Sequence, residues 1–113
     1  MAKLNPIKPT MREKKRYICF RVNKDMPEIE VRKSILSRIK RYIGEKNYAL
    51  ARPQLVSKTY QKNKGIISCN NKQYLDVRFA ITLTEKINDQ TVKVEVPAVS
   101  GMINKAKEKL NHI

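Results

Sequence analysis

The sequence predicts an α+β fold in which one four-stranded antiparallel sheet carries helices on one face. Segments with a two-residue period and segments with a helical period follow one another in the order strand, helix, strand, strand, helix, strand. A chain of 113 residues, 41% of them hydrophobic, is long enough for one buried core and too short for two. Pro6 and Pro9 favour an extended start, so we expect a basic arm over residues 1–15 and a single domain over residues 16–113.

The first predicted strand covers residues 16–22. Apolar side chains alternate there with other side chains, which is typical of a strand that buries one face. We expect one face to consist of Ile18, Phe20 and Val22, and the other of Tyr17, Cys19 and Arg21.

The first predicted helix begins near Pro27, which suits a first helical turn, and ends at Gly44. Residues 45–52 are expected to be irregular, with at most one short helical turn. The apolar stripe of the helix recurs at every fourth residue, at Val31, Ile35, Ile39 and Ile43.

The second half of the chain predicts a hairpin, a helix, a last strand and a short terminal helix. The hairpin strands are expected over residues 55–60 and 66–69, on either side of a basic loop that ends in Gly65. Asn70 or Asn71 can cap the helix, which we expect to continue to about residue 86. Its predicted apolar face consists of Leu75, Val77, Phe79, Ile81 and Leu83. The last strand is expected over residues 91–97, and a short helix follows Gly101.

This order of elements is the split βαββαβ arrangement of ferredoxin-like and RNA-recognition folds, with a short C-terminal helix added. Many functions use this fold, so the topology alone selects none of them.

Net charge narrows the function. Lys and Arg number 25 against 10 Asp and Glu, a formal charge of +15, which attracts nucleic acid first and an anionic membrane or acidic protein second. The first candidate RNA-binding run comprises Arg12, Lys14, Lys15 and Arg16. A second, weaker site is Arg38 and Arg41, because the outward face of the first helix carries bases without acids.

The residues for catalysis by this chain alone are missing. The one histidine, His112, has no evident partner, and the acids fall at predicted helix starts and turns instead of forming a cluster for metal ions. Cys19 and Cys69 form no CxxC motif, so we expect two reduced, buried thiols and no metal site. The chain shows neither a signal peptide nor an apolar run that could span a membrane, and we expect it in the cytoplasm.

The predicted sheet offers little for base stacking, since its third strand has no aromatic residue. We therefore expect phosphates and RNA shape to dominate any RNA contact. The face of the sheet away from the helices suits a protein neighbour better, and its predicted interface residues are Leu55, Tyr60 and Ile66.

The string from Lys8 to Phe20, KPTMREKKRYICF, resembles the opening signature of the archaeal ribonuclease P protein component 2 family. Two further stretches agree with it, residues 65–69 and residues 99–107. The chain departs from the family pattern at Lys8, Met11, Ser68 and Met102.

The resemblance implies a non-catalytic subunit of an RNA-based endoribonuclease, in which the RNA, with Mg²⁺ bound to it, removes the 5′ leader of precursor tRNA. It also implies partners: the ribonuclease P RNA, a TIM-barrel protein subunit in an assembly with two copies of each, and other ribonuclease P proteins. This chain would interact with precursor tRNA only indirectly. The alternative is a stand-alone RNA-binding or ribosomal protein with the same fold; an autonomous nuclease is disfavoured because the residues for it are missing.

Overall fold

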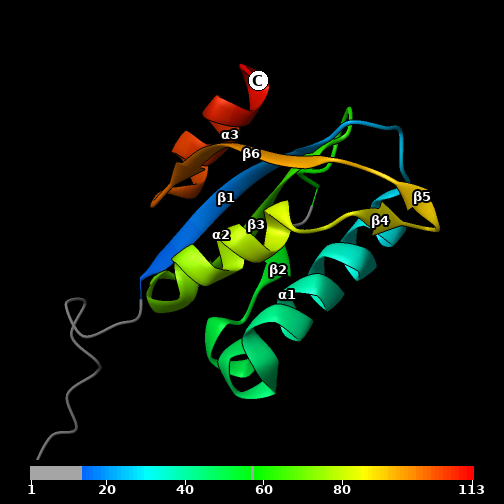
Figure 1. Cartoon of the computed structure of the whole chain (residues 1–113). Coiled ribbons are helices and arrows are strands. Elements are labelled where there is room, and N and C mark those ends of the chain that lie inside the picture. Colours follow the sequence, from blue (N-terminus) through cyan, green and yellow to red (C-terminus); the bar gives the residue numbers. More distant parts are fainter. Residues whose placement is uncertain (1–13, 57) are drawn as a thin grey trace, which may run out of the picture.

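The computed structural model describes residues 14–56 and 58–113 (Figure 1), so all but the end of the predicted arm lies outside the described residues. One four-stranded sheet has the order β2-β3-β1-β6, and every neighbouring pair is antiparallel, as predicted. Its strands are β1 (Lys15–Val22), β2 (Gln54–Leu55), β3 (Lys64–Asn70) and β6 (Val94–Ser100).

Helices cover both faces of the sheet (Figure 1). The helices α1 (Glu28–Ala51) and α2 (Tyr74–Thr82) lie on one face, and α3 (Ile103–Asn111) lies on the other. The main core is therefore on the α1–α2 side, and it includes Ile18, Phe20 and Val22 of β1 as predicted.

The expectation of a half-buried first strand is wrong at its centre. Cys19, on the opposite face of β1, has no exposed surface, because it packs with Ile66 of β3 beneath Ala106 and Leu110 of α3. The Cys19 thiol also donates a hydrogen bond of 3.4 Å to the carbonyl oxygen of Ala106. The terminal helix thus closes part of the sheet face that the sequence predicted to be open.

Helix α1 breaks where the sequence predicted. Gly44 has φ 86° and ψ 165°, a backbone conformation that is almost restricted to glycine. Helical structure then resumes through Ala51 and is longer than the single turn we expected. The predicted stripe is confirmed, since Val31, Ile35 and Ile39 are fully buried.

The hairpin differs from its prediction. Strand β2 contains only Gln54 and Leu55, so the predicted strand over residues 55–60 is wrong beyond its first residue. The chain turns instead at Thr59, whose hydroxyl donates to the carbonyl oxygen of Val56 at 2.6 Å. It then re-enters β3 through Lys62 and Asn63, which both have positive φ, as a tight hairpin turn requires.

Helix α2 presents a different face from the one predicted. Asn70 caps the short helical turn Asn71–Gln73 that precedes it, as one of the two predicted caps. Val77 and Ile81 are buried together with Ala80, but Leu75 is 70% exposed and Phe79 is 51% exposed. Both sets of residues have helical spacing. The set that contains Ala80 faces the core, where the small side chain permits close packing.

The last strand begins later than predicted. A two-stranded ribbon of β4 (Lys86–Ile87) and β5 (Gln90–Thr91) precedes it, with Asn88 and Asp89 in the turn as expected. The Val92 amide continues this ribbon by donating to Glu85 at 2.8 Å, so the sheet strand β6 starts only at Val94.

Candidate nucleic-acid interface

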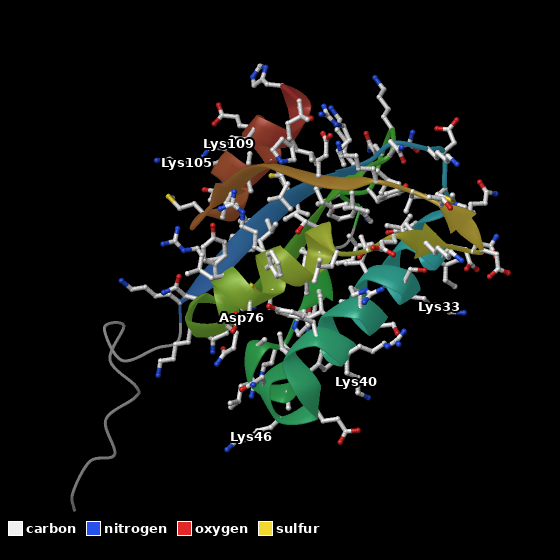
Figure 2. All side chains as sticks on the ribbon, viewed as in Figure 1. Lys33, Lys40, Lys46, Asp76, Lys105 and Lys109 are labelled. Carbon is white, nitrogen blue, oxygen red and sulfur yellow. The ribbon has the colours of Figure 1, made fainter. Side chains whose placement is uncertain are left out.

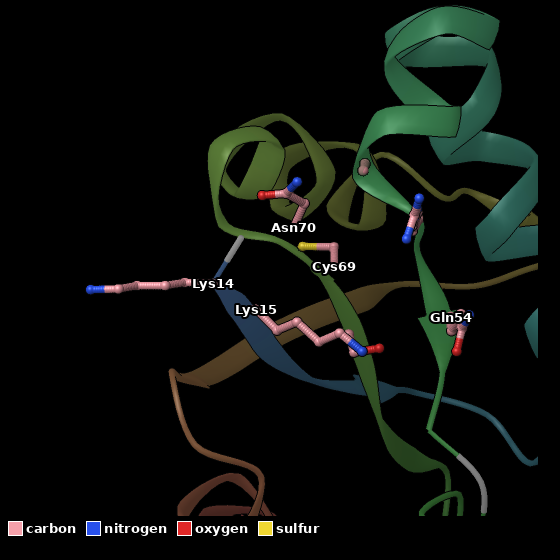
Figure 3. A pocket seen from close by; sticks show the side chains of 8 residues that line it. Lys14, Lys15, Gln54, Cys69 and Asn70 are labelled. Atoms are coloured by element: carbon pink, nitrogen blue, oxygen red, sulfur yellow. The ribbon is translucent and has the colours of Figure 1, made fainter. Parts of the chain in front are cut away.

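The first predicted RNA-binding run lies at the start of β1, at one end of the sheet. Lys14 and Lys15 are exposed, and Arg16 is half-buried; Arg12 lies outside the described residues. In Figure 3, the Lys14 side chain points away from the sheet, whereas that of Lys15 extends over it toward Gln54 of β2. The two amines therefore point in different directions although the residues are adjacent in the sequence.

Two hollows flank these lysines. The first has a volume of about 260 Å³ and lies between the end of α1 and strands β1, β3 and β2 (Figure 3). It is lined by Lys14, Lys15, Ala51, Arg52, Gln54, Ser68, Cys69 and Asn70. The second, of about 590 Å³, shares both lysines and is also lined by Arg16, Tyr17, Asn71 and Gly101. Amines, a guanidinium and amide groups at a hollow are the donors that bind phosphate oxygens.

The thiol in the first hollow is not an additional anion. Cys69 is 2% exposed, and burial raises the pKa of its thiol to about 11. It is therefore neutral near pH 7, and the positive charge of the lysines meets no thiolate.

Arg16 is anchored by contacts that its place in the basic run did not reveal. Its Nε donates a hydrogen bond of 2.7 Å to Oδ1 of Asn71, and its guanidinium carbon lies 5.5 Å from the ring centroid of Tyr74. The sequence predicted that all four bases of the run face an RNA ligand. The structure separates two freely extended lysines from an arginine that joins β1 to the start of α2.

No carboxylate neutralises the candidate bases within the described part of the chain. The two ion pairs found there both involve Glu95, which pairs with Arg21 at 2.8 Å and with Lys93 at 3.8 Å. The Arg21 hydrogen bond and charge lower the pKa of the Glu95 carboxyl. Among the described residues, no acid competes with an external anion for Lys14, Lys15 and Arg16.

The second predicted site, Arg38 and Arg41, lies apart from the first and borders its own hollow of about 300 Å³. Arg38 is half-buried and Arg41 is exposed. The hollow lies between α1 and the segment that follows α2, and its lining residues are Ser34, Ser37, Arg38, Arg41, Thr84, Glu85 and Lys86.

The predicted protein-interface residues are less accessible than expected. Leu55 and Tyr60 are half-buried against the main core, and the Tyr60 hydroxyl donates to the carbonyl oxygen of Met26 at 3.0 Å. Ile66 is fully buried beneath α3, so it offers no surface to a partner in this conformation.

Among the described residues, no group of three or more His, Cys, Asp or Glu side chains could hold a metal ion. Within the same residues, no helix is both long and apolar enough to cross a membrane. Cys19 and Cys69 are buried free thiols.

The chain is similar to proteins of a known family. Residues 16–111 match the model of the Rpp14/Pop5 family. The chain is 37% identical over 107 residues to ribonuclease P protein component 2 of Pyrococcus furiosus, covering 89% of this chain and 86% of that protein. It is 33% identical to the protein of the same name from Methanocaldococcus jannaschii, covering 94% and 79%.

A solved structure shares the fold. A chain in the cryo-EM structure of yeast ribonuclease MRP superimposes with a TM-score of 0.63 at 10% identity, covering 89% of this chain and 88% of that one. At this identity the likeness concerns the fold.

Proposed function

The chain belongs to the Rpp14/Pop5 family and is a protein subunit of ribonuclease P, and we propose that it binds RNA through the basic start of β1. The observation that carries this proposal is the position of Lys14 and Lys15, which are exposed, form no ion pair with any described residue and lie between two hollows. In this enzyme the RNA removes the 5′ leader of precursor tRNA, and the protein subunits act with it in a complex.

The chemistry of the site suits phosphates better than bases. Lysine amines are mobile point charges that displace counterions from an RNA backbone, whereas base recognition needs stacking platforms or paired donors and acceptors. Arg16 is held by Asn71 and Tyr74, so the strand end keeps a fixed direction while the two lysines adapt. By neutralising phosphates that the folded RNA brings together, this end of the chain supports the RNA conformation that cleaves.

The remaining features of the assembly follow from the family resemblance. We propose that the catalytic Mg²⁺ is held by the RNA, because the described residues offer this chain no ligand cluster for it. The proposed protein partner is a TIM-barrel subunit, with two copies of each chain in the complex, together with other ribonuclease P proteins. The proposed compartment is the cytoplasm.

Co-purification of the tagged chain from its host tests this function. We expect ribonuclease P RNA and the other ribonuclease P proteins to be recovered with it. A Lys14→Ala/Lys15→Ala variant should lose the RNA at a lower salt concentration than a Lys62→Ala/Lys93→Ala variant, in which two exposed lysines elsewhere are replaced. Recovery of ribosomal RNA alone would contradict the proposal and favour a ribosomal protein.

A further inference from the structure

Two aromatic side chains lie exposed where α1 meets α2. The rings of Tyr42 and Phe79 are 5.4 Å apart between centroids, with an angle of 54° between their planes. Tyr42 is 47% exposed and Phe79 is 51% exposed, so each ring leaves much of its surface to solvent although the two are in contact. The α1–α2 seam, defined by this pair, carries aromatic surface that the fold does not bury.

The hollow beside Arg38 and Arg41 adjoins this seam. Tyr42 lies four residues beyond Arg38, so these two side chains are neighbours on one face of α1, a face that Arg41 does not share. On the other side of the seam, Thr84 of the hollow follows α2, which carries Phe79. Neither ring lines the hollow, so a nucleotide with its phosphate there would have to extend along α1 to touch the aromatic pair.

The hollow holds a polar group that lacks a partner. Thr84 is 3% exposed, and its hydroxyl oxygen has no hydrogen-bond partner among the described residues. This is costly, but the oxygen has almost no accessible surface, so a ligand could hydrogen-bond to it only after the neighbouring side chains shift. With two arginines, Lys86 and the hydroxyls of Ser34 and Ser37 around it, the hollow offers many donors and suits a phosphate group.

The charge around the hollow is mostly positive. Figure 2 shows Lys33, Lys40 and Lys46 along the outer side of α1. Acids are also present, Glu85 in the hollow, Asp76 on α2, and Glu30 and Glu45 on α1, and the bases outnumber them. An anionic ligand is therefore attracted to this side of the molecule.

We propose that the α1–α2 seam binds an unpaired nucleotide of RNA, with its phosphate at Arg38 and Arg41 and its base against the rings of Tyr42 and Phe79. The base must be unpaired, because a base inside a duplex has both faces stacked already. The proposal rests on the proposed function for its ligand, RNA, and adds base stacking to a surface for which the sequence predicted phosphate contacts alone. A protein partner is disfavoured because cations and hydroxyls border the rings.

A tryptophan reporter tests the site directly. The chain contains no tryptophan, so Phe79→Trp introduces a single fluorophore at the seam. We expect an eight-nucleotide oligouridylate to quench its fluorescence saturably, since a stacked base quenches indole, and a duplex RNA of equal length to leave it unchanged. The matched control is Ile29→Trp, at a residue that is 50% exposed near the start of α1, which should show no quenching. Equal behaviour of the two variants would overturn the proposal.

Affinity measurements provide the second test, on the full chain with fluorescently labelled oligouridylate. Tyr42→Leu/Phe79→Leu keeps apolar side chains but removes both ring faces, and we expect affinity for the single strand to fall about 5- to 100-fold. Duplex affinity should stay unchanged, and Phe79→Tyr, which keeps a ring, should bind like the original chain even if the leucine pair folds poorly.

The outcomes separate this site from the proposed function. If the original chain binds ribonuclease P RNA and the leucine pair binds the single strand equally well, the seam proposal is wrong and the proposed function stands. If the leucine pair instead loses only its association with other ribonuclease P proteins, the seam is a protein-docking surface. If the original chain does not bind ribonuclease P RNA, the proposed function itself is wrong.

Discussion

The guanidinium of Arg16 lies over the ring of Tyr74, with 5.5 Å between the guanidinium carbon and the ring centroid. The same side chain donates from Nε to the side-chain Oδ1 of Asn71 at 2.7 Å, and the backbone N–H of Asn71 donates to the carbonyl oxygen of Lys14 at 2.7 Å. The start of β1 is therefore tied to the start of α2 by side-chain and backbone contacts. One member of the basic run maintains the fold, which leaves its neighbours to bind the ligand.

Replacement of Arg16 by Ala should lower the free energy of unfolding by about 1–2 kcal/mol, because a charged hydrogen bond and a cation–π contact are lost. Arg16→Lys should restore only part of this loss, since an amine lacks the planar guanidinium that reaches Asn71 and Tyr74 together. Urea denaturation measures both. The adjacent exposed Lys15→Ala is the control and should change stability by less than about 0.5 kcal/mol; equal losses in the two alanine variants would contradict the division of roles.

Replacement of Lys14 and Lys15 together by Ala should weaken RNA binding and leave the fold intact. Each phosphate contact removed lowers the log–log salt slope by about 0.7 to 0.9, so we expect the slope to fall by up to about 1.4 to 1.8. Titration of ribonuclease P RNA at several salt concentrations measures this. Lys93→Ala should leave the slope unchanged, and an unaltered slope in a folded double variant would place the phosphate contacts elsewhere.

Gly44→Ala should destabilise the chain through backbone strain. A Cβ atom at Gly44 would meet no atom within 4 Å, yet the φ of 86° and ψ of 165° are unfavourable for any L side chain. We expect a loss of about 1–3 kcal/mol in the free energy of unfolding. Gly101→Ala, where φ is not in the left-handed range, is the comparison and should cost little. If both variants unfold at the same denaturant concentration, the strain argument fails.

The Cys69 thiol should make stability depend on pH in the alkaline range. Burial raises its pKa from 9.0 to about 11, so the unfolded chain ionises first. The stabilisation from the neutral buried thiol is complete below pH 9 and is lost as the pH rises to about 11, a change of at most about 3 kcal/mol. The stability difference between the original chain and Cys69→Ala should therefore narrow across this interval. A difference that stays constant would show that the thiol ionises equally in both states.

Sequence patterns correctly predicted those features of the fold that depend only on residues close together in the chain. Alternation placed Ile18 and Phe20 in the core, and the lack of a side chain at Gly44 marked the break in α1. Periodicity did not decide which side of α2 is buried, because Val77–Ile81 and Leu75–Phe79 have the same spacing. That choice depends on how α1 packs against α2, which is a tertiary property.

For the candidate sites too, the sequence predicted what depends on local residues and missed what depends on tertiary contacts. Charge density along the chain identified Lys14 and Lys15, but it did not separate them from Arg16, whose partner Asn71 is 55 positions away. The burial of Ile66 also escaped prediction, because it depends on α3 folding back over β3 from the end of the chain. Phe79 was predicted to be buried, because an apolar residue at helical spacing usually is, and the structure shows it exposed.

Reconstituted cleavage of precursor tRNA tests the central claim, that this chain is a non-catalytic subunit of ribonuclease P, most directly. Ribonuclease P RNA and its other protein subunits are combined with Mg²⁺ and substrate, with and without this chain, and release of the 5′ leader is measured. We expect leader release to rise when the chain is added, and we expect no cleavage by the chain with Mg²⁺ alone. Cleavage by the chain without ribonuclease P RNA would contradict the account, and so would equal leader release with and without the chain.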